Sequence, residues 1–139
     1  MRTSLRKTFQ IMKSSFYYLA LSLFLLVSTS RAKIGDTIAQ YDAKYGPPQF
    51  SDESNRGYLC NGLAPLIEFS NGVAVSISYR KMKHDSAGNS AAFSSEEIGQ
   101  LLRENSVGWK SEYPNFVSDD GSLGAAYDTV NHILVISKR

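Results

Sequence analysis

Residues 65–80 read PLIEFSNGVAVSISYR, and this stretch contains the clearest β-hairpin pattern in the 139-residue chain. In its second half, Val73, Val75, Ile77 and Tyr79 alternate with smaller or polar residues. Strict alternation of this kind is typical of a strand that buries one face. The stretch therefore predicts strands at 65–69 and 73–80, with the four alternating residues on the inner face of a sheet.

The turn of this hairpin sets which side chains share a face. Asn-Gly favours a two-residue type I′ turn, but that register would place a glutamate opposite a valine and mix the two faces. A three-residue loop, with Gly72 in the left-handed conformation, instead pairs Phe69 with Val73 and Ile67 with Val75. Because a slip of one residue reverses every side chain, we predict the three-residue loop.

A second hairpin is predicted near the carboxyl end, from Leu123–Tyr127 and His132–Ser137 around a turn at Asp128–Asn131. An even loop leaves one face consistently apolar, with the pairs Tyr127–His132, Ala125–Leu134 and Leu123–Ile136. The expected inner face of the sheet then comprises Val73, Val75, Ile77, Tyr79, Leu123, Leu134 and Ile136.

Each hairpin is preceded by a predicted helix. Asp36 is expected to cap a helix over Thr37–Tyr45, and Gly46 followed by Pro47-Pro48 ends it. The spacing Ser94-x-x-Glu97 forms a capping box that opens a second helix through Asn105. Ile98, Leu101 and Leu102 give that helix its apolar stripe, and we expect them to pack on the sheet.

The order helix, hairpin, helix, hairpin predicts an α+β fold: a two-layer sandwich in which an antiparallel sheet of four to six strands carries two helices on one face. This order also fits a diverged duplication, although the two halves share no repeat at the level of residues. The 107 residues from 33 to 139 suit one domain.

Residues 1–32 are predicted to be a signal peptide. Four cations precede an apolar run from Phe16 to Val27, and small residues lead up to Ala32. The run of twelve residues is short for a bilayer span, which takes about 20. Translation starting at Met12 would leave a more ordinary signal. We therefore expect an exported, periplasmic or extracellular domain at 33–139, without a stable membrane anchor once the signal is cleaved.

Charge and cysteine content narrow the classes of partner. Ten of the 15 cations and all 13 acids lie in residues 33–139, which gives the domain a net charge of −3 with both histidines neutral. A net-negative domain lacks the long-range attraction on which nucleic-acid binding depends. Cys60 is the sole cysteine, so the chain has no internal disulfide.

Two segments resemble a known family. Gly35-Asp36-Thr37, eight further residues and Gly46-Pro47-Pro48 resemble the first helix of the SmpA/OmlA small outer-membrane proteins and their β-lactamase-inhibitor-like relatives. The segment Ile67–Val73 is similar to the hairpin that follows it. The resemblance covers about 40 residues and implies a helix-on-sheet fold in a bacterial envelope with a role in protein contact. The lipid-attachment cysteine of the outer-membrane members is absent, and the second helix and hairpin exceed the shorter members' pattern.

Motifs for catalysis, metal or cofactors do not stand out. Cys60 with His84 or His132 is the only conceivable thiol–imidazole pair, and their spacing matches no known arrangement. His132 alternates in phase with Leu134, which predicts a partly buried structural role. One cysteine and two scattered histidines make no zinc spacing. Asp119-Asp120-Gly121-Ser122 predicts a plain turn. We expect no catalytic residue, no metal and no cofactor.

The remaining candidate is a contact site formed by Trp109, Tyr113, Phe116, Ile133 and Val135. Ile133 and Val135 alternate with the predicted core residues of their strand, so they are expected on the opposite face. Exposed apolar strips often mark contact sites. The aromatic segment 109–116 has two interpretations: it covers the sheet's own core, or it forms a rim that a partner completes.

These observations favour a non-enzymatic envelope protein that acts through protein contact, as an assembly factor or inhibitor-like module. A secreted hydrolase with an unrecognised site, or a purely structural envelope component, is the alternative. A partner would be another envelope or secreted protein, whose identity and oligomeric state the sequence leaves open.

The predicted export has a direct test. The mature amino terminus should be Lys33, within a few residues, because the small residues at −3 and −1 precede that position. Intact-mass measurement of the native product checks this. A cytosolic product that retains Met1 or Met12 would contradict it.

Overall fold

The computed structural model describes residues 32–139, so the predicted signal peptide lies outside these residues except for Ala32. The elements in chain order are α2 (Ile38–Tyr45), β1 (Phe50–Ser51), β2 (Asn55–Gly57), β3 (Leu66–Ser70), β4 (Val73–Tyr79), α3 (Ser95–Asn105), β5 (Trp109–Glu112), β6 (Asn115–Ser118), β7 (Leu123–Asp128) and β8 (Ile133–Lys138). Within the described residues, neither helix has the length and hydrophobicity to cross a bilayer.

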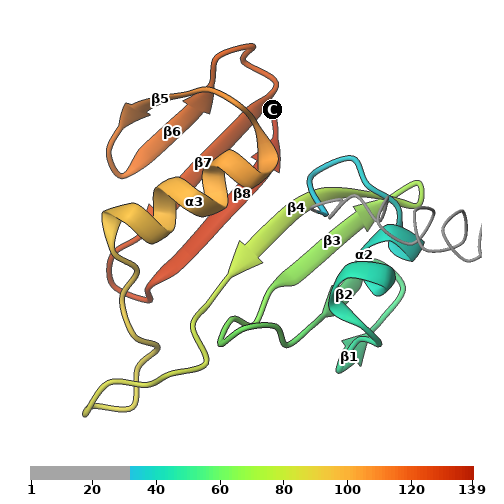
Figure 1. Cartoon of the computed structure of the whole chain (residues 1–139), viewed down its shortest axis with the longest axis horizontal. Coiled ribbons are helices and arrows are strands. Elements are labelled where there is room, and N and C mark those ends of the chain that lie inside the picture. Colours follow the sequence, from blue (N-terminus) through green and yellow to red (C-terminus); the bar gives the residue numbers. More distant parts are fainter. Residues whose placement is uncertain (1–31) are drawn as a thin grey trace, which may run out of the picture. The chain divides into compact units, whose positions relative to one another are not determined.

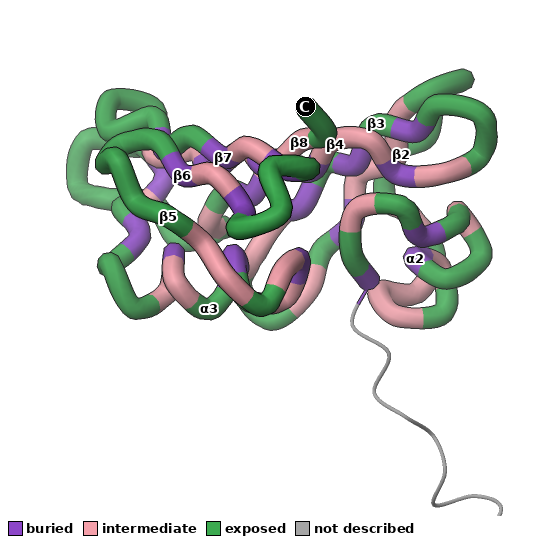
Figure 2. The backbone as a smooth tube through the Cα atoms, turned by 90° about the horizontal axis from the view of Figure 1, so that it is seen from above, coloured by how far each residue is buried: buried purple, intermediate pink, exposed green. Residues whose placement is uncertain are grey.

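The strands form one eight-stranded antiparallel sheet in the order β1-β2-β3-β4-β8-β7-β6-β5, with both helices on the same face (Figures 1 and 2). The α+β class therefore stands, but the expected sheet of four to six strands is wrong. The unexpected strands are β1, β2, β5 and β6, which have two to four residues each. Elements this short show too few alternations for a period of two to emerge.

The chain repeats one arrangement twice: a helix followed by four strands that pair in sequence. The first half contributes α2 and β1–β4, the second α3 and β5–β8. The last strands of the two halves, β4 and β8, pair with each other at the centre of the sheet. The order of helices and strands is thus duplicated, as the sequence suggested from its predicted elements and not from any residue repeat.

The β4–β8 pair forms the middle of the hydrophobic core. Ile77 lies opposite Ile136, and Tyr79 lies opposite Leu134. All four side chains are at most 1% exposed. Helix α3 contributes its buried residues Ile98, Leu101 and Leu102 to the same core cluster, as the apolar stripe predicted.

The predicted three-residue loop of the first hairpin is wrong. Asn71 and Gly72 both have positive φ values, 52° and 78°, as a two-residue type I′ turn requires. Ser70 consequently pairs with Val73, and a bulge between Glu68 and Phe69 then shifts the register so that Ile67 pairs with Ile77. The bulge resolves the mixed faces that had argued against this turn, because it adds one residue to β4.

The bulge also corrects the predicted inner face. Ala74 is fully buried, whereas Val73 and Val75 are only half-buried and do not join the core cluster. Ile77 and Tyr79, beyond the bulge, lie on the inner face as expected.

The second hairpin is displaced by two residues from its predicted register. Tyr127 pairs with Leu134 and Ala125 with Ile136. The carboxylate of Asp128 accepts hydrogen bonds from the backbone N–H groups of Val130 and Asn131, which begins the turn one residue later than expected. Because the displacement is even, the inner face is unchanged, and Leu123, Leu134 and Ile136 are buried as predicted.

Both helices begin with capping boxes. At α2 the cap is Thr37 rather than Asp36, and its side chain accepts a hydrogen bond from the N–H of Gln40. Asp36 instead accepts a hydrogen bond from the N–H of Lys33, at 2.8 Å. The box between Ser94 and Glu97 at α3 is confirmed.

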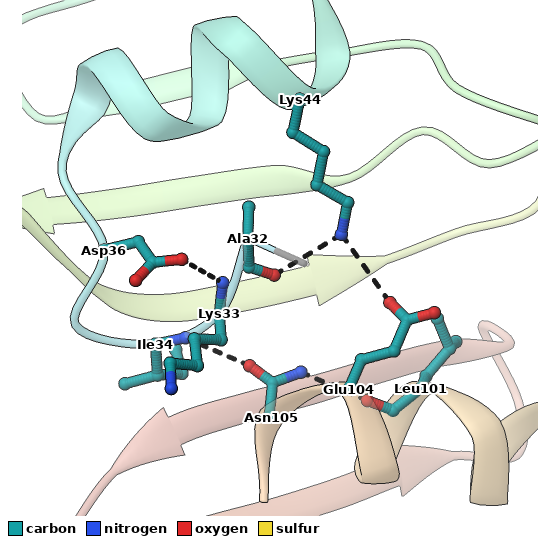
Figure 3. A network of polar contacts seen from close by, with 8 residues as sticks. All are labelled: Ala32, Lys33, Ile34, Asp36, Lys44, Leu101, Glu104 and Asn105. Carbon is teal, nitrogen blue, oxygen red and sulfur yellow. Dashed lines mark hydrogen bonds and ion pairs between the residues drawn. The ribbon is translucent and has the colours of Figure 1, made fainter. Parts of the chain in front are cut away.

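A polar network links the first residues of the described chain to α3 (Figure 3). The side-chain oxygen of Asn105 accepts a hydrogen bond from the N–H of Ile34 at 3.0 Å, and its amide nitrogen donates to the carbonyl of Leu101 at 3.1 Å. Lys44 on α2 forms an ion pair with Glu104 on α3 at 3.7 Å. Asn105 is 9% exposed, so its side chain is satisfied inside the fold.

The central packing predicts the cost of truncating β4 and β8. Ile77→Ala or Leu134→Ala should lower the free energy of unfolding by about 2–5 kcal/mol, because each leaves a cavity in the core. Val75→Ala, from the half-buried bulge, is the matched control and should cost clearly less. Urea denaturation measures all three. Losses under about 0.5 kcal/mol at both core positions would mean that another face is buried.

Candidate functional site

The face of the sheet that carries no helix is the principal candidate surface, and we call it the open face (Figure 2). One row of side chains crosses four neighbouring strands there. The register places Leu66 of β3 beside Ser78 of β4, Ser78 beside Val135 of β8, and Val135 beside Ala126 of β7. These residues alternate with the buried core residues of the same strands, so they point away from the helices.

The open face has a depression of about 370 Å³, lined by Ala64, Leu66, Ser78, Arg80, Ile133 and Val135. Leu66 is 43% exposed, and Ile133 and Val135 are half-buried. The floor is therefore aliphatic, and its polar boundary includes the exposed guanidinium of Arg80.

The structure separates the five predicted contact residues into two groups. Ile133 and Val135 line the depression on the open face. Phe116, at 9% exposure, belongs to the core on the opposite, helical side. Trp109 packs against that core, and its indole nitrogen donates to the carbonyl of Leu102 at 2.8 Å. Tyr113, at the turn between β5 and β6, is 62% exposed.

The aromatic residues and the open-face pair are therefore not parts of one surface. Trp109 and Phe116 cover the protein's own core, and the segment 109–116 folds into the hairpin β5–β6. Their role in partner contact stays a prediction. Leu66 is the residue that the candidate set missed. Its signal was present, since it alternates with Ile67 and Phe69 on a strand whose other face is buried.

A second hollow, of about 270 Å³, lies on the helical side and is lined by residues of α2, α3 and the loop before β3. Its walls include Tyr45, Cys60, Tyr79, Phe93 and Leu101. Burial raises the pKa of the Tyr79 hydroxyl to about 12, so this group remains protonated at neutral pH.

The carboxylates at the rim of this hollow are each paired with a lysine. Glu97 lies 2.8 Å from the Lys81 ammonium, and hydrogen bonding by Lys81, with the N–H of Ser94 next in weight, lowers the pKa of Glu97. Glu104 is paired with Lys44. These ion pairs connect α3 to α2 through Lys44 and to the segment just after β4 through Lys81.

The two histidines lie elsewhere. Neither His84 nor His132 is among the residues that line the hollow beside Cys60. His132 stacks on Tyr127, with its Nδ1 3.3 Å from the tyrosine hydroxyl, which also accepts a hydrogen bond from the N–H of Phe93. His132 has a φ of 56° and stands in the β7–β8 turn, so it contacts the core's edge through Tyr127 rather than from a strand position.

The acidic segment before β7 forms a turn that its own hydrogen bonds explain. The Asp120 carboxylate accepts from the hydroxyl of Ser118 at 2.6 Å and from the N–H of Ser122 at 3.0 Å. These bonds, that of Ser118 foremost, lower the pKa of Asp120 to about 2. Across residues 32–139, no three of the metal-binding side-chain types gather into a group that could hold an ion.

Comparisons with protein-family models, with curated proteins and with solved structures found no match for this chain. The candidate surface therefore rests on its own geometry: a strip of Leu66, Ile133 and Val135 on a helix-free sheet face.

Proposed function

We propose that this protein is an exported, non-enzymatic binding module that contacts another envelope or secreted protein through the open face of its sheet. The observation that supports this most directly is the half-exposed aliphatic strip of Leu66, Ile133 and Val135 at the centre of that face. An exposed apolar strip with a polar boundary is typical of a protein-contact surface.

The central strands favour a protein over a small molecule as the bound partner. The depression is lined by only six residues on an exposed sheet face, whereas pockets for small ligands enclose most of the ligand's surface. Backbone groups of β4 and β8 are already paired within the sheet, so a partner gains affinity from side-chain contacts rather than from strand addition. Arg80 at the boundary offers one directed, charge-assisted hydrogen bond, suited to a carboxylate on the partner.

The export signal in residues 1–32 gives the location in which we expect this contact, the periplasm or the extracellular space. The net charge of −3 for residues 33–139 supports a protein partner rather than nucleic acid.

Site-specific crosslinking tests the proposal. A photoreactive residue at position 66 should capture a partner of defined mass in the envelope, because Leu66 lies within the proposed contact. The same residue at Glu96, exposed on the first turn of α3, is the matched control and should capture none. Adding Val135→Asp should abolish capture at position 66, since it places an unpaired charge in the interface.

Thermal melting of the Val135→Asp variant must stay close to that of the parent for this result to count as lost binding. Equal capture from positions 66 and 96, or capture that survives Val135→Asp, would contradict the proposal. Cys60→Ser should leave capture unchanged, because Cys60 lies on the helical side.

A further inference from the structure

The outer edge of β5 is an unpaired strand edge. In the order of the described sheet, β5 is the last strand and pairs only with β6. Its sequence continues into the turn as Trp109-Lys110-Ser111-Glu112-Tyr113. An open edge presents backbone N–H and C=O groups that another strand can pair with.

The parity of the β5–β6 hairpin shows which backbone groups face outward. Glu112 pairs with Asn115 across the two-residue turn, so their backbone groups face each other. The carbonyl of Gly108 accepts a hydrogen bond from the N–H of Asp119 at 3.1 Å. Gly108 is two residues before Lys110 and four before Glu112, so the backbone groups of these even-numbered residues face β6. Antiparallel pairing alternates, so the backbone groups of Trp109 and Ser111 point to the outer edge.

This edge is complementary to itself. When two copies meet antiparallel about Ser111, the outward groups of Ser111 face those of the second Ser111, and Lys110 of each copy lies directly opposite Glu112 of the other. Lys110 and Glu112 then occupy a non-hydrogen-bonded pair, the type in which side chains are closest. Within residues 32–139 neither side chain takes part in an ion pair, and both are exposed.

The neighbouring registers are excluded by charge. Registers compatible with the outward groups of Trp109 and Ser111 shift the second copy by two residues. Such a shift in one direction places Lys110 opposite Lys110, and in the other places Glu112 opposite Glu112. Like charges directly opposite each other destabilise a strand pair. A lysine on an edge strand ordinarily disfavours pairing with another strand. Here Glu112 of the second copy lies opposite Lys110 in one register, so the charges attract in that register.

The same register brings aromatic residues together at both ends. Trp109 of one copy comes opposite Tyr113 of the other, on the helical side of the sheet. Tyr113 is 62% exposed, and its ring meets Phe116 edge-on, with centroids 6.4 Å apart. A groove of about 250 Å³ between α3 and this edge, lined in part by Ile98, Leu102, Tyr113 and Phe116, lies where the second copy's aromatic side chains would add burial.

We propose that the β5 edge is a homodimer interface, in which a second copy of this chain pairs antiparallel about Ser111 to give one continuous sheet. The two-fold axis stands perpendicular to the sheet, so both helical layers lie on one side and both open faces on the other. The contact is short, a handful of residues per copy, and so predicts a dimer that dissociates on dilution.

Exchanging the charges at positions 110 and 112 tests the dimer. The protein used is the native product, purified with its natural amino terminus. Sedimentation velocity over a concentration series should show a monomer–dimer equilibrium for the parent. K110E and E112K, each alone, should weaken the dimer about tenfold or more, because symmetry makes two pairs repulsive. The double variant K110E/E112K should restore it, and mixing the two single variants should give a heterodimer.

E68K makes the same charge change as E112K, but on β3, away from this edge. It is the matched control and should dimerise like the parent. Raising the salt concentration to about 1 M should strengthen the dimers of the single variants and weaken that of the parent, because it screens both charge patterns. A parent that is monomeric throughout, a dimer indifferent to K110E, or single variants that fail to associate when mixed would overturn the proposal. These results are independent of capture through the open face.

Discussion

The pairing of β4 with β8 is the constraint on which the rest of the structure depends. Each half of the chain is a helix and a four-strand meander of about fifty residues, a size at which an independent core is only marginally stable. The four residue pairs between Ser76–Tyr79 and Leu134–Ser137 make the two meanders one sheet. The core then forms across this seam, where Ile77, Tyr79, Leu134 and Ile136 have almost no exposed surface.

Tyrosines fill much of the space beneath α2, and their hydroxyls set the chemistry of that region. Tyr58 donates to the carboxylate of Asp42 at 2.8 Å, and burial ahead of that bond raises its pKa to about 12. The hydroxyl of Tyr41 is buried without a hydrogen-bond partner among the described residues. An unsatisfied buried hydroxyl costs about 1–3 kcal/mol, which the aromatic packing of Tyr41 against Tyr58 and Phe69 helps to offset.

The elements that could be predicted from sequence are those with strong local signals. The capping box at Ser94, the glycine stop at Gly46 and the alternation of β4 beyond its bulge each reflect an interaction within a few residues. The bulge itself was not predictable. An extra residue in one strand and a turn displaced by one residue give the same sequence pattern, and only the pairing with the partner strand distinguishes them. Strand β5 was missed for another reason: its sequence Trp-Lys-Ser-Glu has no fully buried residue, as is usual for an edge strand.

The candidate surface divides in the same way. Ile133 and Val135 could be assigned to the open face because an even error in register preserves alternation. Trp109 and Phe116 could not be assigned, since their burial depends on α3 lying over β5 and β6, a contact between segments with no shared periodicity. The strip on the open face is a local property of β3 and β8, whereas the aromatic cover is a property of the assembled sandwich.

The central position of β4 has a consequence for how the chain is made. β4 is complete before α3 begins, yet its second neighbour, β8, is the last of the eight strands to be synthesised. During synthesis and early folding, the first half therefore carries an unpaired strand edge that includes Ile77, while the second half is still being made. Pairing strands this far apart in sequence costs chain entropy and slows folding, and until β8 arrives the edge can pair with other chains. A chaperone that holds unfolded chains would have its most useful target in residues 73–79.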